Sequence, residues 1–176
     1  DGTGYGTDGT VWGGEFLDAT RGGFERLGCF GPFRLPGGDA AVRHPLRIAA
    51  AVLGGAGLPV DRLLPELPAA EAGAVAEMLA RNLNAPACSS LGRIFDAAAA
   101  LLGLVRETDY EGEGPVLLEG LAARAWSAGS RPEAEGLVPL GRGSPFRLDP
   151  VPLLARIASA RGTEPGAALA LRFHAE

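Results

Sequence analysis

The opening of the chain is a glycine-rich stretch whose residue types suit the binding of a phosphate. Residues 1–8 read DGTGYGTD, and a further glycine, Gly9, follows them. Because glycine leaves the backbone open and free to adopt positive φ, successive N–H groups in such a stretch can point at one anion. Asp1 and Asp8 flank it and could hold a metal-bound phosphate or orient a hydroxyl. The stretch is not a GxGxxG turn before a helix, so a plain glycine-rich hairpin turn stays the alternative.

A second candidate is the carboxylate of Asp96, in the segment SSLGRIFD over residues 89–96. Apolar residues at helical spacing predict a helix over residues 91–102. On that helix Asp96 would share a face with Arg93 and with three small residues, Gly92, Ala99 and Ala100. A planar ligand could lie close to such a face, with the carboxylate accepting hydrogen bonds from ribose hydroxyls. The alternative is an Arg93–Asp96 ion pair on a solvated helix face.

A third candidate is the loop YEGEGP over residues 110–115, which enters a helix predicted from about Pro115 to Ser127. A helix N-terminus attracts anions, but two carboxylates here argue against a bare phosphate. Gly112 and Glu113 could instead contact ribose or a partner protein, and simple capping of the helix is the equal alternative.

Other reactive residue types are scarce. His44 and His174 are isolated, so we expect no metal site within the chain and no Ser–His–Asp triad. All 16 basic residues are arginine, which excludes a Schiff-base or P-loop lysine. Cys29 and Cys88 match neither a zinc spacing nor CxxC, and we expect two buried reduced thiols rather than a lone disulfide.

Length and composition predict one globular domain. The chain has 176 residues, 47% apolar and 21% charged, which excludes a disordered chain. A net charge of −5 argues against broad binding to nucleic acid. No window approaches the roughly 20 apolar residues of a membrane helix. We expect a cytoplasmic protein without membrane contact.

The elements that must position the candidates fall into two parts. Strands are predicted within 10–18 and 24–35, joined by a turn into a hairpin, and further short strands at 137–140 and 146–148. Asp39 is predicted to cap a helix to about residue 53, interrupted at Pro45. Further helices are predicted over residues 69–83, 91–102, 115–127, 149–160 and, capped by Thr163, to the chain end. We therefore expect an α/β, helix-rich chain, with residues 1–38 as the glycine-rich loop and hairpin and residues 39–176 as the mainly helical part of the same domain.

Several of these segments together resemble, in order, the carbamoyltransferases of the HypF type. They are DGTGYGTDGTVWGGE at 1–15 with GFER at 23–26, LPGGDAAVR at 35–43, SSLGRIFDAAAALLG at 89–103, and YEGE at 110–113. The residues HPLR at 44–47 match too, except that the family usually has an acidic residue before the proline. Phe173 and His174 resemble a late family block. The resemblance covers nearly the whole chain.

The resemblance implies a fold and an activity. The fold is the actin/Hsp70-like (ASKHA) ATPase fold, shared with tRNA threonylcarbamoyl transferases. The activity uses carbamoyl phosphate and ATP to form a carbamoyl adenylate, and passes the carbamoyl group to the C-terminal cysteine of the partner HypE during [NiFe]-hydrogenase maturation. Residues 1–38 would face the nucleotide. The implied nucleotide-binding residues are Gly2, Thr3, Gly4, Gly6, Asp8, Asp96, Gly112 and Glu113.

The chain also departs from the family. The family's histidine-rich metal block and its late Gly-Gly and Asp block are absent, so we expect the ligands of its metal ion to lie outside this chain. Both ends look like cuts, and we expect a fragment of the transferase domain that is inactive alone. Two alternatives stay open: a module that docks the partner without contacting nucleotide, and a small-molecule O-carbamoyltransferase on the same fold.

Overall fold

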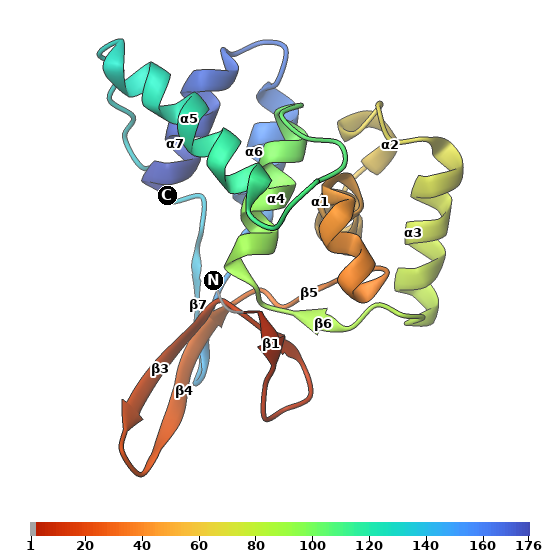
Figure 1. The fold of residues 1–176 in the computed structure, drawn as a ribbon, viewed down its shortest axis with the longest axis vertical. Coiled ribbons are helices and arrows are strands. Elements are labelled where there is room, and N and C mark those ends of the chain that lie inside the picture. The colour runs from red at the N-terminus through yellow and green to blue at the C-terminus, as the bar shows by residue number, and fades with distance from the viewer. Residues whose placement is uncertain (1–2) are drawn as a thin grey trace.

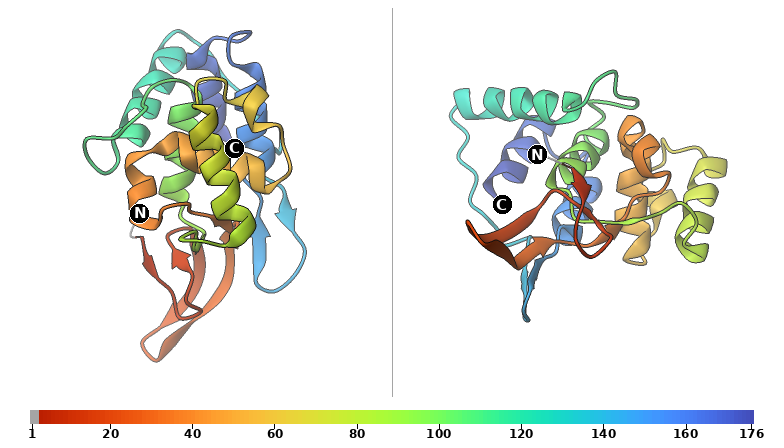
Figure 2. Two further views of the ribbon diagram at one scale, coloured as in Figure 1. Left: turned by 90° about the vertical axis from the view of Figure 1, so that its right-hand side faces the viewer. Right: turned by 60° about the horizontal axis from the view of Figure 1, so that its bottom comes forward.

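The strands gather at one end of the molecule and the helices at the other (Figure 1). This arrangement comes from a computed structural model that describes residues 3–176. Asp1 and Gly2 lie outside the described residues. The fold is mixed α/β with helices predominating, as the sequence predicts. The hairpin near the N-terminus extends away from the helices, as Figure 1 and the left view of Figure 2 both show.

The strands form two four-stranded sheets. In the first, the order is β1 (Gly4–Tyr5), β2 (Val11–Trp12), β6 (Ala87–Cys88) and β5 (Phe33–Arg34), with β2 and β6 parallel. In the second, the order is β3 (Glu15–Thr20), β4 (Gly23–Phe30), β8 (Phe146–Leu148) and β7 (Leu140–Gly141). Strands β3 and β4 pair antiparallel across a turn that starts at Thr20, which confirms the predicted hairpin.

The single strand expected over residues 10–18 is wrong, because the chain changes sheets at Gly13 and Gly14. Strand β2 ends before these glycines and β3 begins after them. A Cβ added at Gly14 would lie 2.3 Å from the carbonyl oxygen of Ser89, so no side chain fits where the two backbones meet. The strand region predicted within 24–35 is broken at Gly31–Pro32 and continues as β5.

The helical part begins with a 3-10 helix, η1 (Gly38–Arg43). The α-helices are α1 (Pro45–Gly55), α2 (Val60–Leu63), α3 (Ala69–Arg81), α4 (Leu91–Leu101), α5 (Glu113–Ser127), α6 (Val151–Ala160) and α7 (Gly166–Ala175). The predicted interruption at Pro45 is confirmed, since η1 ends before it and α1 starts with it. Proline suits that first position because it lacks an N–H that would otherwise stay unpaired.

Two predicted caps are wrong. Asp39 lies inside the first turn of η1, whose N-cap is Gly37 with a φ of 95°. Thr163 lies in the turn after α6, where its hydroxyl donates to the carbonyl of Ala160 at 2.7 Å. Helix α7 begins three residues later, after Pro165. In both cases the residue at the helix start is a glycine or a proline, Gly37 for η1 and Pro165 for α7. Ser90 stands at the N-cap position of α4.

Helix α4 lies at the centre of the core. It packs against α1, α5 and α6, and α5 packs in turn on α7. The views in Figure 2 show α5 along one side of this group. Residues 97–100 of α4 are all alanine and at most 2% exposed. Such small side chains let several helices approach one axis closely. Cys29 and Cys88 are buried free thiols, as predicted.

Candidate functional site

Two cavities meet at Thr3 and Asp39, where the sheet end of the molecule joins the helices. The larger has a volume of about 500 Å³ and is lined, besides these two residues, by others of the glycine-rich segments, among them Gly4, Gly37 and Gly38. The smaller, about 390 Å³, is lined on the other side by Arg43, Arg93, Thr108, Asp109, Tyr110 and Glu111, with Val42. One ligand that spans both cavities would contact backbone amides at one end and charged side chains at the other.

Asp96 is buried and lines neither cavity itself, but its ion-pair partner lines the smaller one. It is 1% exposed, and its partner Arg93, which lines that cavity, is 3% exposed. Arg93 Nε lies 3.0 Å from Asp96 Oδ2, yet neither atom has a hydrogen-bond partner among the described residues. The ion pair of the alternative interpretation therefore exists, but it is not on a solvated face.

The environment of Asp96 changes its acidity. Burial raises the pKa of Asp96 from 3.8 to about 6, opposed by the Arg93 guanidinium and reinforced by the carboxylate of Glu111. The first turn of α5 closes the same face, because a Cβ at Gly114 would lie 3.0 Å from Asp96 Oδ1. The result is an acidic group that is held without full hydrogen bonding next to a cavity. Such groups are frequent at functional sites.

The glycine-rich stretch is both a hairpin turn and a cavity wall. Strand β1 pairs with β2, and Gly6 N donates to the carbonyl of Thr10 at 2.8 Å, so the turn interpretation holds for the backbone. Thr3 lines both cavities and Gly4 lines the larger one. Gly6 instead packs against the indole of Trp12, where an added Cβ would lie 2.1 Å from Nε1. Gly2 lies outside the described residues.

Asp8 closes this turn with its side chain. Its carboxylate accepts hydrogen bonds from Thr10 N at 3.0 Å, Thr10 Oγ1 at 2.7 Å and Trp12 Nε1 at 2.9 Å. It also pairs with Arg26 Nη1 at 2.8 Å. These partners, first of all the Thr10 hydroxyl, lower the pKa of Asp8 to about 2. Asp8 lines neither of the two cavities.

The two carboxylates of the loop before α5, Glu111 and Glu113, have different surroundings. Glu113 Oε2 accepts the backbone N–H of Asp109 at 2.8 Å, which closes the loop onto the helix start. Gly112 is the N-cap of α5, with a φ of 88°. Glu111 and Tyr110 line the smaller cavity. Glu113 therefore ties the loop to the start of α5 without capping the helix, while Glu111, two residues earlier, faces the candidate site.

The two histidines stay apart. His44 lies between η1 and α1, and His174 Nδ1 lies 2.8 Å from the carbonyl oxygen of Ala170. Within residues 3–176 no group of three or more His, Cys, Asp or Glu side chains could hold a metal ion. Residues 3–176 therefore do not fit the metal ion that the resemblance implies.

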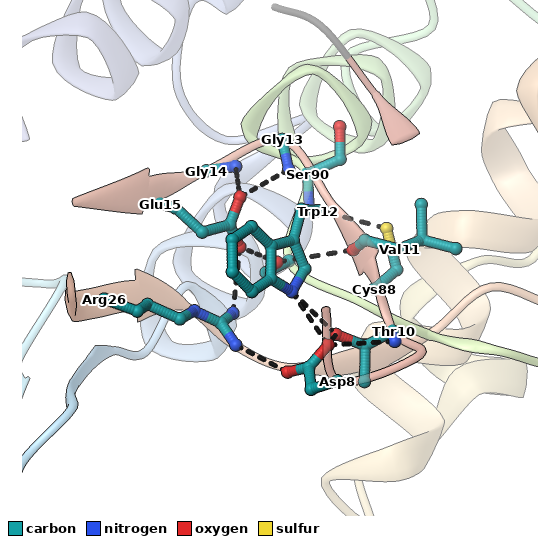
Figure 3. A network of polar contacts seen from close by, with 11 residues as sticks. Asp8, Thr10, Val11, Trp12, Gly13, Gly14, Glu15, Arg26, Cys88 and Ser90 are labelled. Carbon is teal, nitrogen blue, oxygen red and sulfur yellow. Dashed lines mark hydrogen bonds and ion pairs between the residues drawn. The ribbon is translucent and has the colours of Figure 1, made fainter. Parts of the chain in front are cut away.

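Sequence reasoning missed a network of polar contacts that joins the turn, the hairpin and the segment before α4 (Figure 3). Glu15 and Arg26 form its centre, with Nη2 of Arg26 2.9 Å from Oε1 of Glu15. The signal was present, since an acid at the start of one strand and an arginine on the next can pair across a hairpin. What local sequence could not indicate is the third participant, Ser89, which is far away in the chain.

Comparison with known proteins shows the family of this chain. Over residues 1–176 it matches the family described as Carbamoyltransferase, Kae1-like Domain, second subdomain. The chain belongs to the HypF carbamoyltransferase family. It is 40% identical to Carbamoyltransferase HypF2 of Cupriavidus necator, covering 99% of this chain and 24% of that protein. It is 41% identical to Carbamoyltransferase HypF of Rhodobacter capsulatus, covering 90% of this chain and 20% of that protein.

Solved HypF structures share the fold. A crystal structure of full-length HypF in the phosphate- and nucleotide-bound form matches with a TM-score of 0.86 and 29% identity, over 99% of this chain and 22% of that one. HypF of T. kodakarensis matches with a TM-score of 0.79 and 30% identity, over 99% of this chain and 23% of that one. The predicted family and the ASKHA-type α/β fold are confirmed. The chain spans less than a quarter of the length of each of these four proteins.

Within residues 3–176, every helix is too short or too polar to span a lipid bilayer.

Proposed function

We propose that this HypF-family chain forms one wall of a nucleotide site used in carbamoyl transfer. In this proposal a carbamoyl adenylate, made from carbamoyl phosphate and ATP, spans the two cavities that meet at Thr3 and Asp39. The carbamoyl group then passes to the C-terminal cysteine of a HypE-like acceptor. The observation that supports it most is the buried Arg93–Asp96 pair beside the cavity, in a fold that matches a HypF crystallised with phosphate and nucleotide.

The unsatisfied pair suits a ribose. Arg93 Nε is a donor and Asp96 Oδ2 an acceptor; both are buried, and apart from their mutual ion pair neither has a hydrogen-bond partner among the described residues. A ribose hydroxyl can accept from one and donate to the other, so binding would supply the missing hydrogen bonds. Thr3 and Gly4, at the opposite cavity, would face the phosphate with a hydroxyl and a backbone N–H.

Catalysis by this wall would be positional. The attacking group is the acceptor's thiolate, and the chain's residues hold the adenylate so that its carbonyl carbon meets that sulfur. The acyl–phosphate bond breaks, the new C–S bond forms, and AMP leaves with the electron pair on its phosphate oxygen. The metal ion implied for the full-length protein would take its ligands from segments outside this chain.

The test is nucleotide affinity of the full-length protein that contains this chain, measured by calorimetry with AMP. Asp96→Ala should weaken binding by about 1–3 kcal/mol, the range for hydrogen bonds to a charged group. Asp18→Ala, on the exposed face of the hairpin, is the matched control and should leave affinity unchanged. Equal affinity of the correctly folded Asp96 variant would remove this residue from the site.

The acceptor is tested separately. The full-length protein, with carbamoyl phosphate and ATP, should carbamoylate a peptide that ends in the HypE cysteine, and the isolated 176-residue chain should not. Transfer to a small-molecule hydroxyl instead of the peptide would favour an O-carbamoyltransferase. Peptide binding without any nucleotide affinity would favour a docking module. Carbamoylation by the isolated chain would show that the segments outside it are dispensable.

A further inference from the structure

We infer that Glu15 is a positioning residue for the nucleotide site, through the network drawn in Figure 3. Its carboxylate sets the spacing between the glycine-rich turn and the N-terminus of α4, the two segments that carry Thr3 and Asp96. Glu15 itself lines neither cavity. The inference rests on the proposed function, because it says how that site is kept in shape.

The carboxylate of Glu15 has four donors from three parts of the chain. Oε2 accepts the backbone N–H groups of Gly13 at 2.6 Å and Gly14 at 3.0 Å. Oε1 accepts Arg26 Nη2 at 2.9 Å and the hydroxyl of Ser89. The side chain is 6% exposed. Since a carboxylate offers about four lone-pair sites, this one is fully used within the protein. Glu15 is therefore a junction, and no acceptor capacity is left for a ligand.

Arg26 extends the junction to the glycine-rich turn. Its second amino group, Nη1, pairs with Asp8 at 2.8 Å, and its guanidinium lies 4.4 Å from the ring centroid of Trp12. The indole N–H of Trp12 also donates to Asp8, at 2.9 Å. Gly6 packs on the same indole. One arginine of the hairpin thus contacts the turn at Asp8 and the following strand at Trp12, whose partner on β1 is Gly4.

The junction also reaches α4 by backbone contacts. Ser89 N donates to the carbonyl of Val11 at 2.9 Å, and Leu91 N donates to that of Gly13 at 3.1 Å. Between Ser89 and Leu91, Ser90 has its hydroxyl oxygen 3.2 Å from Oγ1 of Thr3. A displacement of Ser89 would therefore move the start of α4 and Thr3 together. This is the path from Glu15 to the cavity wall.

Both the charge and the length of Glu15 are used. A glutamine keeps the volume of the side chain but replaces one carboxylate oxygen with an NH2 group. That group would face either Arg26 and Ser89 or the two glycine N–H groups, all of which are donors, so at least one pair of hydrogen bonds would be lost. An aspartate keeps the charge but is shorter by one methylene and cannot span from the turn to Ser89. If charge alone mattered, aspartate would suffice; if position matters, both replacements fail.

The experiment uses AMP affinity and steady-state transfer by the full-length protein. Glu15→Gln and Glu15→Asp should each raise the dissociation constant of AMP by about 10-fold to 100-fold, the scale for residues that orient a site without touching the ligand. The Michaelis constant for ATP should rise with it. Glu77→Gln is the control, since it breaks an exposed i,i+4 pair with Arg81 on α3 and should change nothing.

A double-mutant cycle separates positioning from general loss of structure. Ser89→Ala should weaken AMP binding less than Glu15→Gln, and adding it to Glu15→Gln should cost little more, because both remove the same contact. Additive effects, or unchanged affinity in both Glu15 variants, would overturn the inference. If the unaltered protein binds no AMP, it is the proposed function that fails. Melting temperatures of all variants show whether each is folded.

Discussion

The titration of Asp96 leads to a prediction of how pH changes stability. The folded protein raises the pKa of this carboxyl from 3.8 to about 6, chiefly through burial. A shift of about two pKa units corresponds to ~3 kcal/mol between the charged and neutral forms. Asp96→Asn removes the titration while keeping the shape of the side chain. The comparison of wild type with this variant therefore isolates one group.

The sign follows from proton binding. Between about pH 4 and pH 6 the folded carboxyl holds its proton more firmly than the unfolded one, so the folded state carries more protons. The free energy of unfolding of the wild type therefore falls as pH rises through this window, and this loss of stability is complete above about pH 6. Relative to Asp96→Asn, the wild type should lose up to ~3 kcal/mol between pH 4 and pH 7.

Urea unfolding of both chains at several pH values measures this difference, and a ¹³C titration of the Asp96 carboxyl gives its pKa directly. A difference that does not change with pH would show that Asp96 titrates normally. A difference that grows in favour of the wild type would show that its ion pair with Arg93 outweighs burial. Nucleotide should oppose this trend: if ribose donates to the ionised carboxylate, AMP binding should strengthen as pH rises through about 6 and weaken below it.

Three further outcomes follow from packing. Gly114→Ala should lower the free energy of unfolding by about 1–3 kcal/mol, because its Cβ would press on the buried carboxylate of Asp96. Gly120→Ala on the same helix has open space around it and should raise that free energy by up to ~1 kcal/mol, both measured by urea unfolding. Gly6→Val should lower the melting temperature as well as transfer activity, since its side chain would collide with Trp12; an unchanged melting temperature would contradict this geometry. Both cysteines are buried with a raised pKa, so a thiol reagent such as DTNB should react slowly with the native chain and fast in urea.

Local sequence determined most of the secondary structure. The spacing of apolar residues predicts α4 over 91–102, and the structure has it at Leu91–Leu101. The hairpin, the interruption at Pro45 and the strand at 146–148 were equally predictable, because each depends on a periodicity or a turn residue within a few positions. The exceptions are two caps, where several nearby residues compete for one helix start, and the strand over residues 10–18, which Gly13 and Gly14 divide between two sheets.

Tertiary structure alone decided the chemical state of the site. The same sequence pattern allows Asp96 to be solvated or buried, and only the packing of α4 against the first turn of α5 makes it a buried carboxylate with a raised pKa. Likewise, Glu15 and Ser89 are 74 positions apart, and nothing near either residue indicates that they meet. Sequence patterns report contacts between neighbours along the chain. The energies that set an acidity or align two segments come from residues brought together by folding.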